Sequence, residues 1–496
     1  MSFHPKQIGL WLGPILFLAV LALRPLNVEA EGTLLQPGCN EVLAISVWII
    51  TWWVFEAVPL AVTALLPIVL FSTLGVKRLD EVLVCYADKV LYLFFGGFIL
   101  ALGLEAHNLH KRIALLIIRA VGLSPNRLLL GFLISTAFIS MWISNTATAV
   151  MMLPMAMSCL SLLNEGQTRE QLESREHKNF AAALMLIIAY GASIGGMSTI
   201  IGTPPNLYMR GYFAEELGIN ISFFTWMLWG IPITILLVAA TYLLLTIFLF
   251  PCSKLGLTNA QQVFLVEQEK LGQMKPVHWR MIIVFGVTTL LWMTRSFIQN
   301  YLPNLPLTGK PIPLSDEVIA IAAAISLFLI PGSEKGKKIL EWEDTKKMPW
   351  GILLLFGGGI AIAKSLEQAG LLEALSKVVQ ETTGDHPLLL IILLTTLCLY
   401  LTEVMSNIAL VQVMIPIIAA IAVGMDADPV LFAFPATLAA SCAFMLPMST
   451  PPNGIVFGSG KIAVWDMIRA GFWLNLASLI IILIVSQPLL RLFPYK

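Results

Sequence analysis

Long apolar runs follow one another along nearly the whole chain, and short polar stretches separate them. A helix needs roughly 20 mainly apolar residues to cross a lipid bilayer, and about eleven runs come close to that length. Two of the longest contain a Pro-Pro pair, so we expect each to be a helix that breaks partway across the membrane, because proline cannot continue a helix. The predicted spans are 8–26, 41–57, 59–76, 88–106, 180–213 (broken), 222–250, 281–299, 316–331, 350–366, 430–460 (broken) and 465–490.

Two further apolar segments, 126–162 and 387–424, carry a polar cluster at their centres. The first contains "WISNTATAVMMLP" from Trp142, and the second contains "VMSNIALVQVMIP" from Val404. Each segment is long enough for two half-height helices joined at a tip. Non-helical backbone at membrane depth is tolerated only where it is buried or lines a cavity. We therefore predict two re-entrant hairpins with polar tips.

The two halves of the chain repeat the same motifs in the same order. "LFFGGFILALGLE" begins at Leu93 and "LLFGGGIAIAKSLE" at Leu354, and "TPPN" ends at Asn206 and again at Asn453. Each repeat holds five spans and one hairpin. Because five is odd, the second copy enters the membrane upside down. The predicted fold is therefore an all-α polytopic membrane protein with two inverted-topology repeats, an arrangement that builds transporters with a site at the midplane.

Composition supports a membrane protein and excludes several other classes. Only 12% of the 496 residues are charged and the mean hydropathy is +0.84, whereas soluble proteins average about 25% charged residues. The net charge of zero implies no nucleic-acid partner. The six cysteines are scattered without a CxxC pair, which argues against a disulfide framework or a metal site. No histidine lies beside either tip, so a serine nucleophile there would lack a base and we do not expect an enzyme.

Basic residues gather in three connections, around 111–127, 254–280 and 335–347. With eleven crossings, the positive-inside rule places these loops and the N-terminus in the cytoplasm and the C-terminus outside. The compact termini suggest a bacterial inner membrane.

The helix breaks and the tips combine residue types that suit an anion. At each break, threonine can cap the new helix and proline fits its first turn, as in Thr203-Pro204 and Thr450-Pro451. Each half-helix N-terminus favours a nearby anion by roughly 0.3–1 kcal/mol. Moving a doubly charged anion out of water costs several kcal/mol per charge, and no Arg, Lys or His lies in a tip or a break. We therefore expect mobile cations to supply the missing charge.

Neutral oxygens near the tips form two candidate Na⁺ cages. Ser, Thr and Asn in membrane helices often only join helices by hydrogen bonds, but their recurrence beside both Pro-Pro breaks favours a binding site. The first cage combines Ser140, Ser144 and Asn145 with the carbonyl of Gly202; the second combines Thr402, Ser406 and Asn407 with the carbonyl of Ser449, with Met405 included beside them.

The paired SNT-type tips, the paired TPPN breaks, "FGGF", "NLHKRIAL" and "SCAFMLPMSTPPNGIVFGSG" resemble those of the divalent anion/sodium symporter family over nearly the whole chain. The resemblance implies a homodimer, a fixed scaffold and a transport domain that moves like an elevator. It also implies Na⁺ coupling, no organic cofactor, and C4-dicarboxylate, citrate-like or sulfate substrates. By match to the motifs, the residues expected to touch substrate are Asn145, Thr146, Thr203, Pro204, Asn407, Thr450 and Pro451.

The family pattern also divides the chain into scaffold and transport parts, with interfacial arms at 107–121 and 367–381. The expected parts are 1–40 (first helix and external loop), 41–121 (scaffold of repeat 1), 122–250 (transport part of repeat 1), 251–280 (cytoplasmic linker), 281–381 (scaffold of repeat 2) and 382–496 (transport part of repeat 2).

Two positions near the second tip depart from the symmetry of the repeats. Ile408 is also expected to bind substrate, but it stands where the fuller motif has threonine, which makes this half of the site more apolar and bears on substrate identity. Glu403 stands where the first repeat has Met141; an acid inside a membrane is a functional candidate, either as a proton site or as a carboxylate that stiffens the tip. The predicted function is a sodium-coupled symporter that imports a C4-dicarboxylate such as succinate, malate or fumarate. The alternatives are a sodium-independent exchanger, or citrate or sulfate as the substrate.

Overall fold

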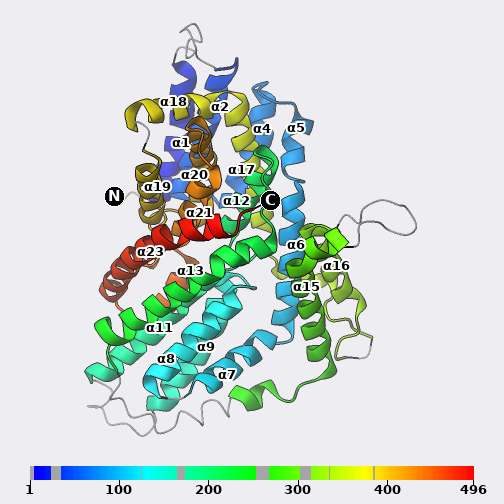
Figure 1. The fold of residues 1–496 in the computed structure, drawn as a ribbon, viewed down its shortest axis with the longest axis vertical. Helices are drawn as coiled ribbons and strands as arrows, with labels where there is room; N and C mark the ends of the chain where they lie inside the picture. Colours follow the sequence, from blue (N-terminus) through cyan, green and yellow to red (C-terminus); the bar gives the residue numbers. More distant parts are fainter. Residues whose placement is uncertain are drawn as a thin grey trace.

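The computed structural model describes residues 5–23, 35–122, 124–164, 174–252, 267–301, 314–334, 336–383 and 386–495. Within these ranges the regular elements are helices (Figure 1). Most of the predicted loop 27–40 and much of the predicted cytoplasmic linker, at 253–266, lie outside the described residues.

The first half of the chain contributes the helices that precede the long polar linker. They are α1 (Pro5–Ala22), α2 (Cys39–Phe55), α3 (Leu60–Thr63), α4 (Leu66–Thr73), α5 (Leu79–Cys85), α6 (Lys89–Ala106), α7 (Leu109–Val121), α8 (Pro125–Ser140), α9 (Asn145–Asn164), α11 (Arg175–Gly196), α12 (Pro204–Glu216) and α13 (Phe223–Leu243), which the π-helical turn η1 (Leu244–Leu249) extends.

The second half repeats much of this order. Its elements are α15 (Pro276–Tyr301), α16 (Asp316–Leu329), the 3₁₀ segment η2 (Trp342–Lys347), α17 (Trp350–Gln368), α18 (Leu371–Thr383), α19 (Pro387–Leu401), α20 (Asn407–Gly424), α21 (Pro429–Ala439), α22 (Pro451–Phe457) and α23 (Val464–Leu492).

The apolar lengths of these helices suit a membrane. Within the described ranges, seven helical stretches are long and apolar enough to cross a bilayer, and six apolar stretches are shorter, with the hairpin helices α8 and α19 among them. The single span predicted at 59–76 is wrong: the chain forms α3 and α4 there. Pro67 falls in the first turn of α4, where its missing N–H group is tolerated, whereas it would interrupt one continuous helix.

The packing of the helices is reciprocal between the two halves. α12 of the first repeat packs against α20 and α21 of the second, while α22 of the second packs against α9 and α11 of the first. In Figure 1, α7 lies near one end of the long axis and α18 near the opposite end, and the pairs α8–α9 and α19–α20 lie in opposite halves of the molecule. This arrangement matches the predicted inverted repeats.

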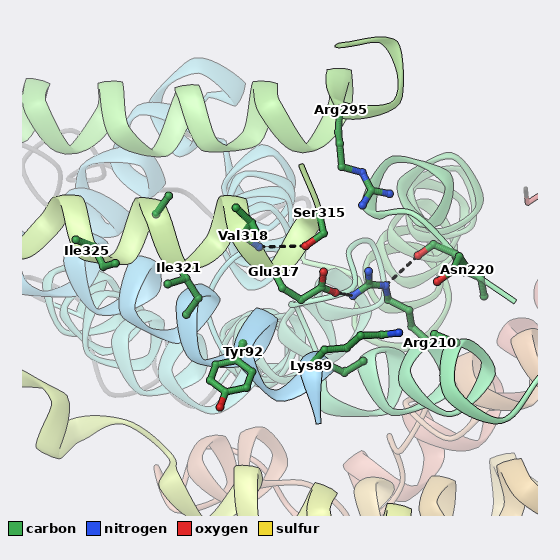
Figure 2. Close-up of a pocket in the computed structure, with 14 residues that line it drawn as sticks. Lys89, Tyr92, Arg210, Asn220, Arg295, Ser315, Glu317, Val318, Ile321 and Ile325 are labelled. Carbon is green, nitrogen blue, oxygen red and sulfur yellow. Dashed lines mark hydrogen bonds and ion pairs between the residues drawn. The ribbon is translucent and has the colours of Figure 1, made fainter. Parts of the chain in front are cut away.

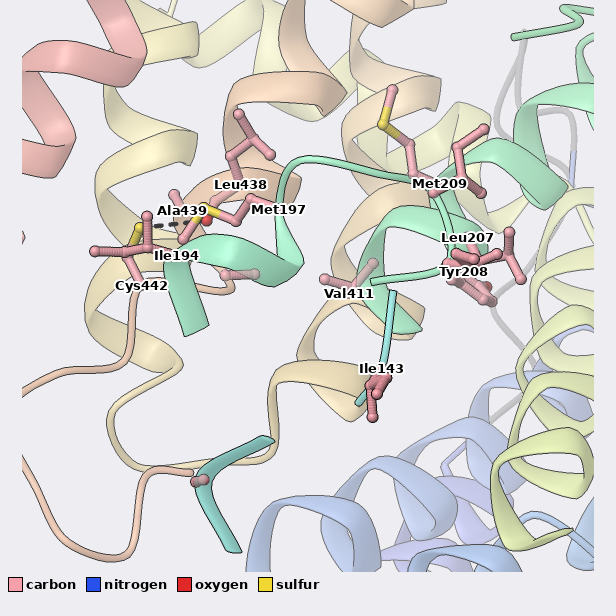
Figure 3. Packing of buried hydrophobic residues seen from close by; sticks show 14 of the residues in the cluster. Ile143, Ile194, Met197, Leu207, Tyr208, Met209, Val411, Leu438, Ala439 and Cys442 are labelled. Carbon is pink, nitrogen blue, oxygen red and sulfur yellow. Dashed lines mark hydrogen bonds between the residues drawn. The ribbon is translucent and has the colours of Figure 1, made fainter. Parts of the chain in front are cut away.

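A continuous core joins the two repeats, and the outside of the molecule is apolar. Ile194, Met197 and Leu207 of the first repeat share one buried cluster with Val411 and Leu438 of the second (Figure 3). Many large apolar side chains on the outside remain exposed, which water would penalise and lipid would accommodate; examples are Trp11, Leu116, Ile235, Phe248 and Ile484. The protein is an integral, multi-pass membrane protein.

Candidate binding site at the two hairpin tips

The two tips are held by the same set of hydrogen bonds. In the first, the Ser140 hydroxyl lies 2.8 Å from Asn145 Oδ1 and 2.6 Å from the Ala192 carbonyl oxygen of α11. In the second, the Thr402 hydroxyl lies 2.7 Å from Asn407 Oδ1 and 2.5 Å from the carbonyl oxygen of Ala440, just after α21. Both hydroxyls are fully buried. Each hydroxyl therefore ties the asparagine of its tip to the broken helix of the same repeat.

A glycine at the end of α11 lets the Asn145 side-chain oxygen and the Gly202 carbonyl oxygen lie close together beside the first tip. A Cβ atom added at Gly196, the last residue of α11, would lie 2.4 Å from Asn145 Oδ1 and 3.1 Å from the Gly202 carbonyl oxygen. Glycine at 196 is therefore what allows the asparagine and the break to meet. The structure brings together Ser140, Asn145 and Gly202, three of the four residues predicted for the first cage.

The remaining polar residues of the tips start the second helix of each hairpin. Ser144 precedes α9 and its Oγ accepts from the Ala147 N–H (3.3 Å). Ser406 is the N-cap of α20, and its side chain makes no capping hydrogen bond. The helices begin at the asparagines themselves, so each serine stands at the N-terminal end of a helix, and only the Ser144 side chain caps it. Met405 is half-buried beside the second tip.

The two breaks have nearly identical geometry at their second helix. Thr203 (φ −144°, ψ 142°) and Thr450 (φ −142°, ψ 150°) are the N-cap residues of α12 and α22, and proline follows in each first turn. Neither threonine side chain makes a capping hydrogen bond, and Thr450 Oγ1 is buried without a partner. Both hydroxyls are therefore free for a ligand. Pro204 is half-buried and Pro451 is exposed.

Two further asparagines, to which the sequence analysis gave no role, fasten the breaks. The Asn206 amide donates to the Gly196 and Thr199 carbonyl oxygens (3.1 and 2.7 Å), and the Asn453 amide donates to the Ala443 and Leu446 carbonyl oxygens (both 3.0 Å). Both are the last residue of a TPPN motif. Their recurrence was visible in the sequence, but the carbonyl groups that they hold become adjacent only in the folded break.

The substrate-side residues differ in exposure between the repeats. Thr146 on α9 is exposed, whereas Ile408, the equivalent position on α20, is half-buried. The hydrogen bonds above join each tip to its own repeat. The packing of α9 against α22 and of α12 against α20 is what brings the two half-sites together.

The donor set fits a small, hard alkali cation. Hydroxyl, amide and unwound main-chain oxygens are the ligands used by Na⁺ sites in broken-helix transporters. In the part of the chain that the structure describes, no cluster of three His, Cys, Asp or Glu side chains could hold a metal ion. The oxygens of Ser140, Asn145, Thr402 and Asn407 at the tips are neutral.

An ion-pair cluster away from the tips borders a crevice of about 700 Å³ between α6, α12 and α16, into which Arg210 and Glu317 face (Figure 2). Arg210 on α12 donates to Glu317 (2.9 Å) and Asp316 (3.1 Å) on α16, and Arg210 and Asp316 are both buried. An arginine inside an apolar span is an expected sign of a buried partner, but the sequence does not show that the partners are Asp316 and Glu317.

An all-helical membrane fold of two inverted halves, each with a hairpin tip tied to a broken helix, is that of a secondary transporter. The chain belongs to the family described as the sodium:sulfate symporter transmembrane region, whose family model matches residues 10–491. The predicted family is thereby confirmed, and the protein is a transporter and not an enzyme.

Relatives and solved structures agree with this assignment. The chain is 40% identical over 491 residues to a sodium-dependent dicarboxylate transporter, SdcS, of Staphylococcus saprophyticus, covering 98% of this chain and 91% of the relative. It is 40% identical over 483 residues to SdcS of Staphylococcus aureus strain RF122, covering 97% and 90%. The fold resembles the YdaH transporter of Alcanivorax borkumensis (TM-score 0.57, 14% identity, 99% of this chain and 98% of that chain). It also resembles MtrF of Neisseria gonorrhoeae (TM-score 0.55, 14% identity, 98% and 95%).

Proposed function

We propose that this protein is a sodium-coupled symporter that imports a C4-dicarboxylate such as succinate, malate or fumarate. The observation that carries the proposal is the matched pair of tips, in which a buried hydroxyl fixes each asparagine Oδ1 against a broken helix. The names of the SdcS relatives support both the sodium dependence and the dicarboxylate substrate. The family description names sulfate, so sulfate and citrate belong in any substrate panel.

We propose that the residues of the tips hold the cations and that those of the breaks meet the substrate. Ser140, Ser144, Asn145 and the Gly202 carbonyl would hold one Na⁺, and Thr402, Met405, Ser406, Asn407 and the Ser449 carbonyl would hold another. Bound cations supply the positive charge that the tips and breaks lack. The carboxylates of the substrate would meet the free threonine hydroxyls and helix N-termini at 203–204 and 450–451, and Thr146 on the exposed side of α9. Asn145 and Asn407 are proposed to serve both cation and substrate, which is the physical origin of coupling.

The proposed transport cycle moves one part of the molecule against another. We assign the helices of 41–121 and 281–381 to a scaffold, and those of 122–250 and 382–496 to an elevator-like transport domain. The amphipathic helices α7 and α18 would be the arms that join them. A homodimer in a bacterial inner membrane, with the N-terminus cytoplasmic and the C-terminus external, completes the proposal. A cavity of about 600 Å³, lined by Ile143 and Ala147 near the first tip and by Lys111 and Lys347 at its polar end, would connect the site with the basic cytoplasmic loops.

Uptake by purified protein in proteoliposomes tests this function. We expect succinate uptake driven by an inward Na⁺ gradient and absent with choline, with malate and fumarate as competitors. Counterflow that proceeds equally well without Na⁺ would instead indicate an exchanger. Asn145→Ala and Asn407→Ala should abolish uptake in protein that still folds; wild-type kinetics in both variants would contradict the site assignment.

A further inference from the structure

The helix break of the second repeat is wider than that of the first. α11 ends at Gly196 and α12 begins at Pro204, so residues 197–203 form the first break. α21 ends at Ala439 and α22 begins at Pro451, so residues 440–450 form the second. The asparagines that end the two TPPN motifs donate to the carbonyl oxygens of Gly196 and Ala443, so Gly196 corresponds to Ala443. The second repeat thus unwinds over positions that remain helical in the first.

Side chains at these positions explain the difference. A Cβ atom at Gly195 would lie 2.6 Å from the Ala137 Cα atom of α8, and one at Gly196 would overlap Asn145 Oδ1. The helical path of α11 is therefore open only to residues without a side chain. Ala443 carries a Cβ atom and cannot follow that path, and Phe444 after it packs its ring on Tyr190 (5.1 Å between ring centroids).

Unwinding frees main-chain N–H groups that a helix would have satisfied, and leaving them unpaired at membrane depth is costly. A single side chain accepts them. Glu403 Oε1 accepts from the N–H groups of Phe444 (2.8 Å) and Met445 (3.0 Å), and Oε2 lies 3.3 Å from the Leu446 N–H nitrogen.

Two side chains complete the ring of donors around this carboxylate. The Ser449 hydroxyl lies 2.7 Å from Oε2 and 2.9 Å from the main-chain oxygen of Glu403, and the Asn475 amide of α23 donates to Oε1 (2.7 Å). Glu403 is only 5% exposed, and all of these donors are neutral. Met141, at the equivalent position of the first repeat, has no carboxylate. Its main-chain oxygen accepts a hydrogen bond from the Thr199 hydroxyl (2.5 Å).

We propose that Glu403 is the positioning residue of the second cation site: its carboxylate holds segment 443–449 against the hairpin tip and thereby directs the Ser449 carbonyl and Thr450 toward the cage. The carboxylate itself is not a ligand of the cation. It replaces the helical hydrogen bonds that the glycines make possible in the first repeat, so the two cages are built by different means. This inference rests on the proposed sodium-coupled function.

Sodium titration of thermal stability in purified transporter tests the role without relying on transport. The unfolding temperature is measured as NaCl replaces choline chloride at constant ionic strength. Residues that hydrogen-bond to metal ligands without touching the metal typically change metal affinity about 10–100-fold when they are mutated. We therefore expect Glu403→Gln to require at least about tenfold more Na⁺ for half-maximal stabilisation. Ser449→Ala removes the hydroxyl that lies within hydrogen-bond distance of two Glu403 oxygens but keeps the Ser449 carbonyl. It should shift the midpoint in the same direction by less. Glu373→Gln, on the exposed side of α18, is the control for loss of one acid and should titrate like the wild type.

The outcomes separate a positioning role from a purely structural one. If both variants unfold at a lower temperature in choline but keep the wild-type Na⁺ midpoint, the proposal is overturned. If Glu403→Gln does not fold, the Na⁺ midpoint of Ser449→Ala decides: a raised midpoint supports the proposal and a wild-type midpoint overturns it. Absence of any Na⁺ effect on the wild-type protein would contradict the proposed sodium coupling itself, which distinguishes the two failures.

Discussion

Adding one methyl group at Gly196 tests how closely the first tip and its break must meet. In Gly196→Ala the new Cβ would lie 2.4 Å from Asn145 Oδ1, whereas ordinary contact begins at 3.4 Å. The asparagine or the end of α11 must therefore retreat by about 1 Å, and misplacement on this scale can reduce the rate of a positioned step about 100-fold. The same overpacking should destabilise the fold by about 1–3 kcal/mol.

The assay is initial-rate uptake of labelled succinate in proteoliposomes at several Na⁺ concentrations. We expect Gly196→Ala to reduce uptake at low Na⁺ by about 100-fold and to raise the Na⁺ concentration for half-maximal rate. Gly286→Ala in α15 is the matched control, because a Cβ at Gly286 meets nothing within 4 Å and alanine favours a helix. Wild-type Na⁺ dependence in Gly196→Ala would refute the view that Asn145 Oδ1 and the Gly202 carbonyl form a cation cage.

Three further changes probe substrate choice, the ion-pair cluster and pH. Ile408→Thr restores a hydroxyl at the second tip and should change the ranking of succinate, citrate and sulfate in competition more than it changes Na⁺ dependence; an unchanged ranking would count against a role for this position. Arg210→Ala leaves Asp316 buried without its main partner and should cost about 3–5 kcal/mol of stability, seen as a lower unfolding temperature, whereas Arg78→Ala breaks an exposed pair worth about 0–1 kcal/mol; equal shifts would argue against a stabilising cluster. Burial lowers the pKa of His110 on α7 to about 4, so the ring stays neutral between pH 5.5 and 8. His110→Gln should therefore leave the pH profile of uptake in this range unchanged. In the wild-type protein, His110 should lower the stability as pH falls below about 6.5, because the unfolded chain takes up the proton first.

The sequence predicted the tips and the breaks because each combines residues that conflict with an apolar helix. The polar clusters around Asn145 and Asn407 and the Pro-Pro pairs after Thr203 and Thr450 interrupt long hydrophobic runs, and their recurrence revealed the repeats. Local chemistry of this kind requires no knowledge of tertiary contacts. It is sufficient to locate where helices start and stop at membrane depth.

The sequence could not predict how the breaks are held, because that depends on residues far apart in the chain. The donors that surround Glu403 come from residues 444–449 and from Asn475, and only the fold brings them to one carboxylate. The greater width of the second break likewise depends on which residue stands beside the tip, Gly196 in the first repeat and Ala443 in the second. The partners of Arg210 are not predictable from the sequence for the same reason, since both acids lie about a hundred residues away in the chain.

Substrate binding to the purified protein with and without sodium tests the central claim, that cation and dianion bind together at the two tips. Succinate affinity is measured by calorimetry as NaCl replaces choline chloride at constant ionic strength. The account predicts no measurable binding in choline and an affinity that rises with Na⁺ concentration. Succinate affinity that is equal in both salts would contradict it.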